Sequence, residues 1–208
     1  VCAIAPGEWV HSHNLKTNLA GALSYEYRPN WTEQKASCGR TFRGYRRTDG
    51  RVGIRNEVWI IPTVGCVNAI ARQIETAAQS LRTGSIDGIY AYTHPYGCSQ
   101  LGDDQLRIQK ALSGLIRHPN AGAVLVLGLG CENNGIDALR AVLGPVDPER
   151  VQFLNCADEP DEVAAALALL RPLCARAAEA IRTECPVSDL VLGLKCGGSD
   201  GFSGITAN

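Results

Sequence analysis

Five short apolar runs recur between residues 58 and 194, and they limit the possible folds of this chain more than any other feature. They are rich in Val, Ile, Leu and Tyr and do not alternate cleanly with polar residues, which is typical of strands buried on both faces of a parallel sheet. The predicted strands are Val58–Ile61, Ile89–Tyr92, Ala123–Leu127, Val151–Leu154 and Leu190–Leu194.

Segments with helical periodicity separate these runs. Helices are expected over Asn68–Leu81, Asp103–Arg117 and Asp137–Leu143. A further helix is expected to start near Asp158, and Pro172 is expected to kink or split it. Because strands and helices alternate, connected by right-handed crossovers, the sequence predicts an α/β domain with a parallel sheet, a Rossmann-like three-layer fold.

The first part of the chain has a different character. Residues 1–37 contain a turn at Pro6-Gly7, a short β-like run from Trp9 and then a polar stretch. This pattern indicates the end of a small β domain followed by a linker, with the α/β domain over residues 38–208. The sequence has no methionine, so we expect it to be a piece of a longer protein.

Composition narrows the possible partners and the compartment. Lys and Arg together number 20 against 21 Asp and Glu, which argues against a nucleic-acid-binding face or a polybasic membrane-binding face. No uncharged stretch approaches the ~20 apolar residues of a membrane span, and nothing resembles a signal peptide. The nine cysteines are too few for a disulfide scaffold and odd in number. We therefore expect cytoplasmic thiols in a protein that binds neither nucleic acid nor membrane.

A cysteine follows each predicted strand. Three of them come directly after a glycine: Cys66, Cys98 and Cys131. The carboxyl ends of parallel strands meet at one edge of a sheet, where ligands bind, so these thiols are expected to share that edge. A free cysteine is often only a small buried residue, but three Gly-Cys pairs favour a shared site. Thiolates there could hold iron, as a single ion or as an iron–sulfur cluster, whereas the absence of a local C-x-x-C pair argues against a zinc ribbon.

Three histidines are further candidates. His94 lies four residues before Cys98 and is either a metal ligand, a proton carrier or a structural residue. If the run from Trp9 is extended, His11 and His13 share one face. That pair would suit a divalent metal, with two exposed histidines near a domain end as the alternative.

Three loops carry groups that suit an anion or a nucleotide. Arg51 and Arg55 could clamp a carboxylate bidentately, or belong to a solvated basic loop. The segment Lys195–Gly201 offers glycine amides, a lysine and an aspartate, which suit an anion nest or an ordinary turn but lack the phosphate-loop order. Gly128–Gly135 is only superficially like a dinucleotide fingerprint, because Asn133 stands where the third glycine belongs.

Together these segments resemble the altronate/galactarate dehydratase family of sugar-acid dehydratases. The matching segments are Asp49–Asn56, His94–Gly102, Gly128–Asn134 and Leu194–Asn208. The run Glu8–Leu15 is similar to the end of the small β-clip domain (SAF-type) that precedes the catalytic body in this family. Members of the family continue beyond Asn208, which implies that the α/β dehydratase domain is incomplete at its C-terminus.

The resemblance implies loss of water from an aldonic or aldaric acid such as altronate or galactarate, giving a 2-keto-3-deoxy acid. It implies iron (Fe²⁺) or a similar ion such as Mn²⁺, which would polarise the carboxylate and the leaving hydroxyl while a base removes the neighbouring proton. The candidate site residues fall into three roles.

The candidates for catalysis are the bases His94 and Lys195, with Glu132 as acid or ligand. Those for substrate binding are Arg51, Arg55, Asn56, Ser199 and Asp200. Those for metal binding are Cys66, Cys98, Cys131, His11 and His13.

The predicted substrate site lies between two loops. Arg51 and Arg55 are expected to fold back to the sheet edge that carries Cys66, with the Lys195–Asp200 loop reaching it from the other side. The partner is a small-molecule sugar acid, and a homo-oligomer is expected. The alternatives are an enzyme like sulfolactate sulfo-lyase, sharing the metal and the carboxylate clamp, and a non-catalytic fragment that binds a metal or an anion.

Overall fold

The structure is a computed structural model that describes residues 6–7 and 39–193. Gly39–Leu190 form one compact unit. The predicted turn at Pro6-Gly7 is present, with Gly7 at a φ of 93°. The rest of the predicted β-domain tail and linker lies outside the described residues.

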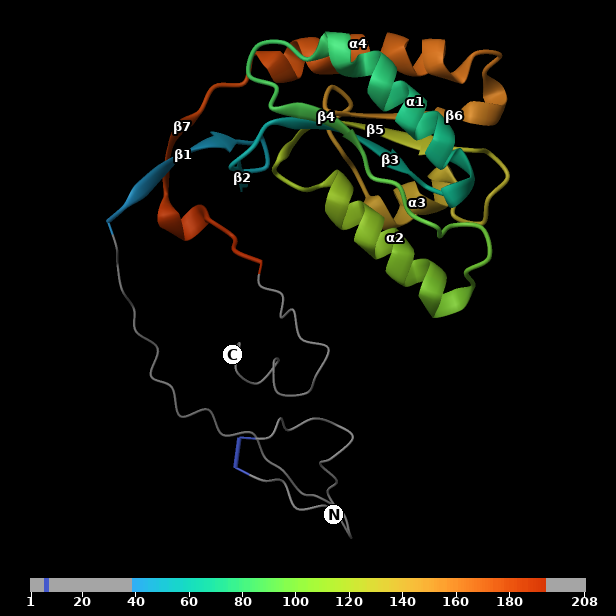
Figure 1. Ribbon diagram of the computed structural model, residues 1–208, viewed down its shortest axis with the longest axis horizontal. Coiled ribbons are helices and arrows are strands. Elements are labelled where there is room, and N and C mark those ends of the chain that lie inside the picture. The colour runs from blue at the N-terminus through green and yellow to red at the C-terminus, as the bar shows by residue number, and fades with distance from the viewer. Residues whose placement is uncertain (1–5, 8–38, 194–208) are drawn as a thin grey trace. The chain divides into compact units, whose positions relative to one another are not determined.

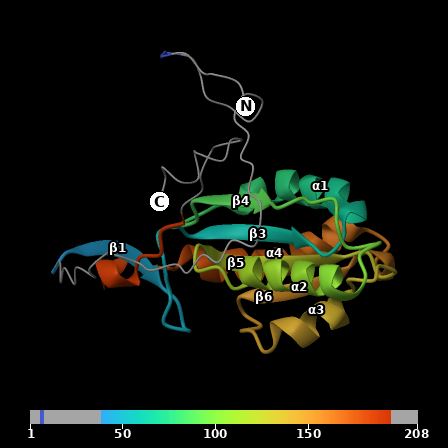
Figure 2. The ribbon, with the colours of Figure 1, turned by 90° about the horizontal axis from the view of Figure 1, so that it is seen from below.

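The main sheet has four parallel strands in the order β4-β3-β5-β6 (Figure 2). Their bounds are Glu57–Pro62 for β3, Gly88–Ala91 for β4, Ala121–Gly128 for β5 and Val151–Asn155 for β6. Four of the five predicted strands are therefore confirmed within a residue or two. The connections from β3 and from β5 lead in opposite directions along the sheet, so a topological switch point lies between these two strands.

Helices cover both faces of this sheet (Figure 1). One face carries α1 (Asn68–Ala78) and α4 (Glu162–Ala178), and the other carries α2 (Gly102–Ile116) and α3 (Ile136–Leu143). The alternation along β3 supplies both cores, because Val58 and Ile60 pack towards α1 and α4 while Trp59 packs towards α2 and α3. The predicted three-layer α/β fold is confirmed.

The last helix, α4, differs from its prediction in where it starts and in its continuity at Pro172. It begins after Asp161, whose carboxylate accepts a hydrogen bond from the Ala164 amide at 2.8 Å, and not near Asp158. It also runs without a break past Pro172. Proline removes one backbone donor, but buried neighbours such as Leu170 and Leu173 hold this helix against the sheet.

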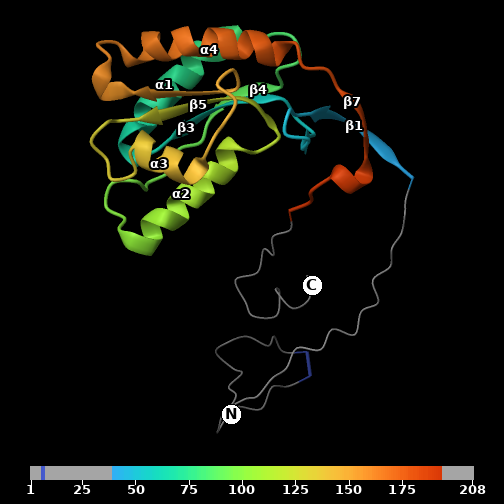
Figure 3. The same cartoon turned by 180° about the vertical axis from the view of Figure 1, so that it is seen from behind.

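A second, three-stranded antiparallel sheet lies beside the first, as seen from behind in Figure 3. It contains β1 (Thr41–Arg46), β2 (Val52–Gly53) and β7 (Thr183–Pro186), in the order β2-β1-β7. The predicted fifth parallel strand over Leu190–Leu194 is wrong, since residues 190–193 form no strand. In the part of the chain that the structure describes, no helix is both long and apolar enough to cross a membrane.

Candidate functional site

The candidate site lies at the switch point, beyond the carboxyl ends of β3 and β5. Three loops meet there: residues 63–67 after β3, residues 92–101 after β4, and residues 129–135 after β5. The Gly65 amide donates to the Tyr96 carbonyl at 2.8 Å, and the Asn134 amide donates to the Gly97 carbonyl at 3.1 Å. These backbone bonds join all three loops into one surface at the place where open α/β sheets bind ligands.

Gly97 permits the close contact between two of these loops. Its φ is 110°, and a Cβ placed on it would lie 2.2 Å from the Thr63 carbonyl oxygen. Any other residue would therefore be strained and would push the loop away from the end of β3. The Gly-Cys pair here serves close backbone approach, and it leaves the neighbouring Cys98 exposed.

Glu132 is the centre of the loop after β5. Its side chain is buried, and its carboxylate accepts three hydrogen bonds: from the Thr63 hydroxyl at 2.5 Å, the Gly130 amide at 2.7 Å and the Leu129 amide at 3.1 Å. Asn134 is also buried and donates to the Thr63 carbonyl at 2.8 Å. Thr63 thus connects the end of β3 to two residues of the neighbouring loop.

These contacts set the charge of Glu132. Burial by itself raises the pKa of its carboxyl, but the Thr63 hydroxyl and the backbone amides outweigh burial and hold the pKa below its ordinary value. Glu132 is therefore a carboxylate at neutral pH, with its oxygens already engaged. This arrangement suits a residue that fixes the loop and does not suit a general acid.

His94 is also engaged on both sides of its ring. Nδ1 accepts from the Tyr96 amide at 3.2 Å, and Nε2 lies 2.8 Å from the Pro62 carbonyl oxygen. Since a carbonyl can only accept, Nε2 carries the proton and the ring is held as the neutral Nε2–H tautomer. His94 joins its loop to the end of β3, and in this conformation neither ring nitrogen is open to a substrate or a metal.

The strand-end cysteines that the structure describes fall into two groups. Cys66, Cys98 and Cys131 are exposed on the three loops of the candidate site. Cys156 is buried after β6, and burial raises the pKa of its thiol to about 11, so it stays protonated. The prediction that Cys66, Cys98 and Cys131 follow strands at one edge of the sheet is confirmed by the strand order.

The fit to a metal ion is incomplete. Thiolates are suitable ligands for iron, and three thiols are present on adjoining loops. Among the described residues, however, no three His, Cys, Asp or Glu side chains converge so that they could hold a metal ion. Metal binding at this edge stays a prediction. His11, His13, Lys195, Ser199 and Asp200 lie outside the described residues.

The predicted placement of the arginines is wrong. Arg55 forms an ion pair with Glu57, the first residue of β3, whereas Cys66 follows the other end of that strand. Arg51 pairs with Asp49 at 2.5 Å in the turn before β2. The hydrogen bonds from the Ile54 and Arg55 amides to Asn120 fix this segment beside the start of β5, so it cannot fold back to the carboxyl edge.

Asn56 is buried and fully engaged at the same amino edge. Its amide donates to the Ala177 carbonyl at 2.8 Å and to the Ser85 hydroxyl at 3.0 Å, and its carbonyl oxygen accepts from Arg47 at 3.0 Å. A Cβ on Gly122 would lie 2.1 Å from that oxygen, so the packing is close. These contacts connect the beginning of β3 to the end of α4 and leave no polar atom for a substrate.

The sequence analysis did not predict that Thr63 and Asn134 join the end of β3 to the loop after β5. Thr63 precedes a Gly-Cys pair, and Asn134 belongs to a segment that was singled out for its resemblance to a family motif. The position of Thr63 could have indicated its role, because a polar residue directly after a buried strand lies at the sheet edge where the loops meet.

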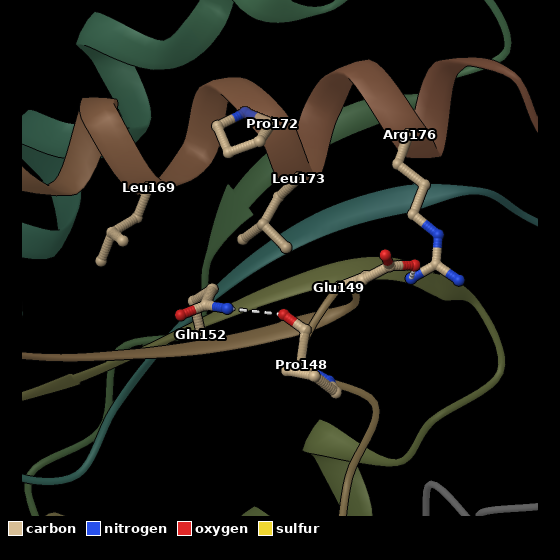
Figure 4. A pocket seen from close by; sticks show the side chains of 7 residues that line it. All are labelled: Pro148, Glu149, Gln152, Leu169, Pro172, Leu173 and Arg176. Carbon is tan, nitrogen blue, oxygen red and sulfur yellow. Dashed lines mark hydrogen bonds and ion pairs between the residues drawn. The ribbon is translucent and has the colours of Figure 1, made fainter.

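A groove elsewhere on the unit contains none of the predicted site residues. It has a volume of about 560 Å³ and lies between the start of β6 and α4 (Figure 4). Pro148, Gln152, Leu169 and Leu173 line it. The chemistry-bearing side chains are at the ends of the strands, so this groove at the side of the sheet is not the candidate site.

Comparisons with known proteins place the chain in a family. Residues 44–178 match the family model described as D-galactarate dehydratase/Altronate hydrolase, second domain. Residues 187–208 match the model described as D-galactarate/Altronate dehydratase, C-terminal.

Similar curated proteins carry related names. The chain is 49% identical over 208 residues to an altronate dehydratase of Escherichia coli (strain K12), a match over 99% of this chain and 42% of that protein. It is 50% identical over 210 residues to an altronate dehydratase of Bacillus subtilis (strain 168), again over 99% of this chain and 42% of that protein. The subunit beta of a (2R)-sulfolactate sulfo-lyase from Chromohalobacter salexigens is 37% identical over 82% of this chain and 41% of its own length.

The chain thus spans about two fifths of the length of these relatives. The first family model covers more than half of the chain, in the region that contains the complete parallel sheet and its helices. The chain therefore belongs to the D-galactarate dehydratase/altronate hydrolase family.

Proposed function

We propose that this chain is the central part of a hydro-lyase that dehydrates an aldonic or aldaric acid, with altronate as the first candidate and galactarate as the second. The observation that carries the proposal is the near-50% identity to two altronate dehydratases along almost the whole chain. The joined loops at the switch point support it, because they offer a preformed surface at the usual ligand edge.

The reaction removes a proton beside the carboxylate and a hydroxyl from the next carbon, and it gives a 2-keto-3-deoxy acid. A base is needed for the first step. Both nitrogens of His94 are bonded to the backbone, which favours Lys195 over His94 as that base. His94 and Glu132 then act as positioning residues that hold the loops around the substrate.

The proposal for the base is tested in the full-length protein with Lys195→Ala. Turnover should fall by about 10²–10⁴-fold, the usual range for loss of a general base. Lys110→Ala is the matched control, because Lys110 is exposed on α2 and outside the three loops. Unchanged turnover in Lys195→Ala would remove the lysine from this role.

Iron(II) or Mn²⁺ is the proposed cofactor, with an iron–sulfur cluster as its alternative form. The exposed thiols of Cys66, Cys98 and Cys131 support this choice, since soft donors suit iron. Replacing Cys98 by Ser should lower the metal content measured by elemental analysis, whereas Cys174→Ser should not, because Cys174 is buried away from the loops. Full iron content in the Cys98 variant would end the ligand proposal for that thiol.

The substrate is decided by direct assay of the full-length protein in the presence of Fe(II). Altronate, galactarate and sulfolactate are offered separately, and the keto acid and sulfite are measured. Keto acid from altronate or galactarate supports the dehydratase. Sulfite from sulfolactate would favour the second candidate, a sulfo-lyase, which the 37% identity to a sulfo-lyase subunit supports. We further propose a cytoplasmic homo-oligomer.

A further inference from the structure

Two adjoining cavities lie at the amino edge of the main sheet, opposite the candidate site. They have volumes of about 220 Å³ and 140 Å³ and share lining residues. The larger cavity is lined by four arginines and two aspartates, with Thr48, Pro145 and Val146 completing it. The charged members are Arg47, Arg51, Arg117, Arg150, Asp49 and Asp147.

Backbone carbonyls hold two of the arginines rigidly. Arg47 donates to the Pro119 carbonyl at 2.7 Å and to the Arg55 carbonyl at 3.1 Å. Arg150 donates to the His118 carbonyl at 3.0 Å and, through two nitrogens, to the Ala121 carbonyl. Their positive charges are therefore fixed at this edge by neutral partners, which orient a guanidinium without neutralising it.

Three of the arginines keep a donor group available. Within the described part of the chain, Nη1 of Arg51, of Arg117 and of Arg150 has no hydrogen-bond partner. The other nitrogens of Arg51 bind Asp49, and Nη2 of Arg117 binds the Leu143 and Pro145 carbonyls. Donors from three separate segments thus line one cavity.

The positive charges are close enough to affect one another. Burial, followed by the charge of Arg150, lowers the pKa of Arg47 to about 10. Burial also lowers the pKa of Arg150, and Arg51 and Arg117 add to that effect against the pull of Asp49 and Asp147. A bound anion would reduce this repulsion between the guanidinium groups.

The two aspartates offset only part of the charge of the four arginines. Asp147 pairs with Arg176 at 3.0 Å, an arginine that does not line the larger cavity. Asp49 pairs with Arg51, which is exposed, whereas the other three arginines that line the cavity are half-buried. Arg117 and Arg150 have no carboxylate partner among the described residues, where they bind only carbonyl oxygens.

We propose that this arginine cluster is an anion site that binds a compact oxyanion, either a phosphate group or a small carboxylate. A guanidinium binds both kinds of oxyanion through paired N–H donors, and several arginines together select for more than one negative oxygen. The site is separated from the cysteine loops by the length of the strands, so it is distinct from the proposed dehydratase site and does not depend on it.

The test is calorimetric titration of the full chain with sodium phosphate and, separately, with succinate, at an ionic strength matched with chloride. Arg51→Gln should weaken binding about tenfold, because it removes a charged donor. Asp49→Asn should strengthen it, because it removes a negative charge and releases two more nitrogens of Arg51. Arg107→Gln, an exposed arginine on α2, is the control with the same loss of charge and should have no effect.

Each outcome decides the proposal. Saturable binding of phosphate or of succinate, with opposite effects of the two variants, supports the site and identifies its ligand class. Absence of binding, or binding that Arg51→Gln and Asp49→Asn change in the same direction, overturns it. Circular dichroism of the variants controls for folding. Both changed side chains are exposed, and the hydrogen bonds that they form within the described residues join these two residues to each other.

Discussion

The Thr63 hydroxyl donates a hydrogen bond of 2.5 Å to Oε1 of Glu132, and this contact joins the end of β3 to the loop after β5. The two residues are separated by 69 positions in the chain, and they meet because β3 and β5 are neighbours in the sheet. The bond crosses the switch point and holds together two of the segments that form the candidate site.

Replacing Glu132 by Gln should destabilise the compact unit. Gln keeps one acceptor but brings an NH₂ group towards amides that can only donate, so about 1.5–3 kcal/mol of unfolding free energy is expected to be lost. Urea unfolding at neutral pH measures the change. Glu179→Gln, an exposed residue at the end of α4, is the control and should stay within about 0.5 kcal/mol of the parent.

The stabilisation from Glu132 should depend on pH. Its pKa is lower in the folded state than in the unfolded chain, so its contribution is present above the ordinary range of a glutamate. That contribution is lost as the pH falls through the lowered pKa. The difference in unfolding free energy between the parent and Glu132→Gln should therefore shrink between pH 7 and pH 3, and a constant difference would contradict the assignment.

Replacing Asn56 by Ala should cost more than a typical surface change. Its side chain is buried, and the loss would leave Arg47, Ser85 and the Ala177 carbonyl without their partner. We expect a loss of about 3 kcal/mol or more, since each buried group left unpaired is costly. Asn133→Ala, an exposed asparagine, is the control. A similar small effect in both variants would contradict the structural role.

The cysteines should react in two classes. In metal-free protein at pH 8, iodoacetamide should modify the exposed Cys66, Cys98 and Cys131. Cys156 and Cys174 should be protected, because they are buried and burial raises the pKa of each thiol to about 11. Peptide mass spectrometry resolves each site, and urea should abolish the difference. Labelling of Cys156 as fast as Cys98 in the folded protein would contradict this placement.

The small antiparallel sheet shows where sequence patterns stop being informative. Strand β1 carries arginines and Gly44, so its pattern is that of a basic loop. A Cβ on Gly44 would lie 2.5 Å from Val52, so the glycine allows β2 to pack against the strand. Its other neighbour, β7, pairs Gly44 with Thr183, a contact between distant parts of the chain. No local pattern in either segment specifies that pairing.

The sequence by itself determined the parallel α/β core, because a run such as Val58–Ile61, buried on both faces, has to be covered by helices on both sides. It also determined which loops follow the strands, and hence that Cys66, Cys98 and Cys131 share an edge. Only the tertiary structure decided which hydrogen bonds and ion pairs the polar side chains form, and at which edge of the sheet they lie. The carboxylate of Glu132 and the ring of His94 are fully engaged, and Arg51 and Arg55 lie at the opposite edge. Periodicity reports which face of an element is buried, whereas hydrogen-bond partners and charge neighbours depend on which loops the folded sheet brings together.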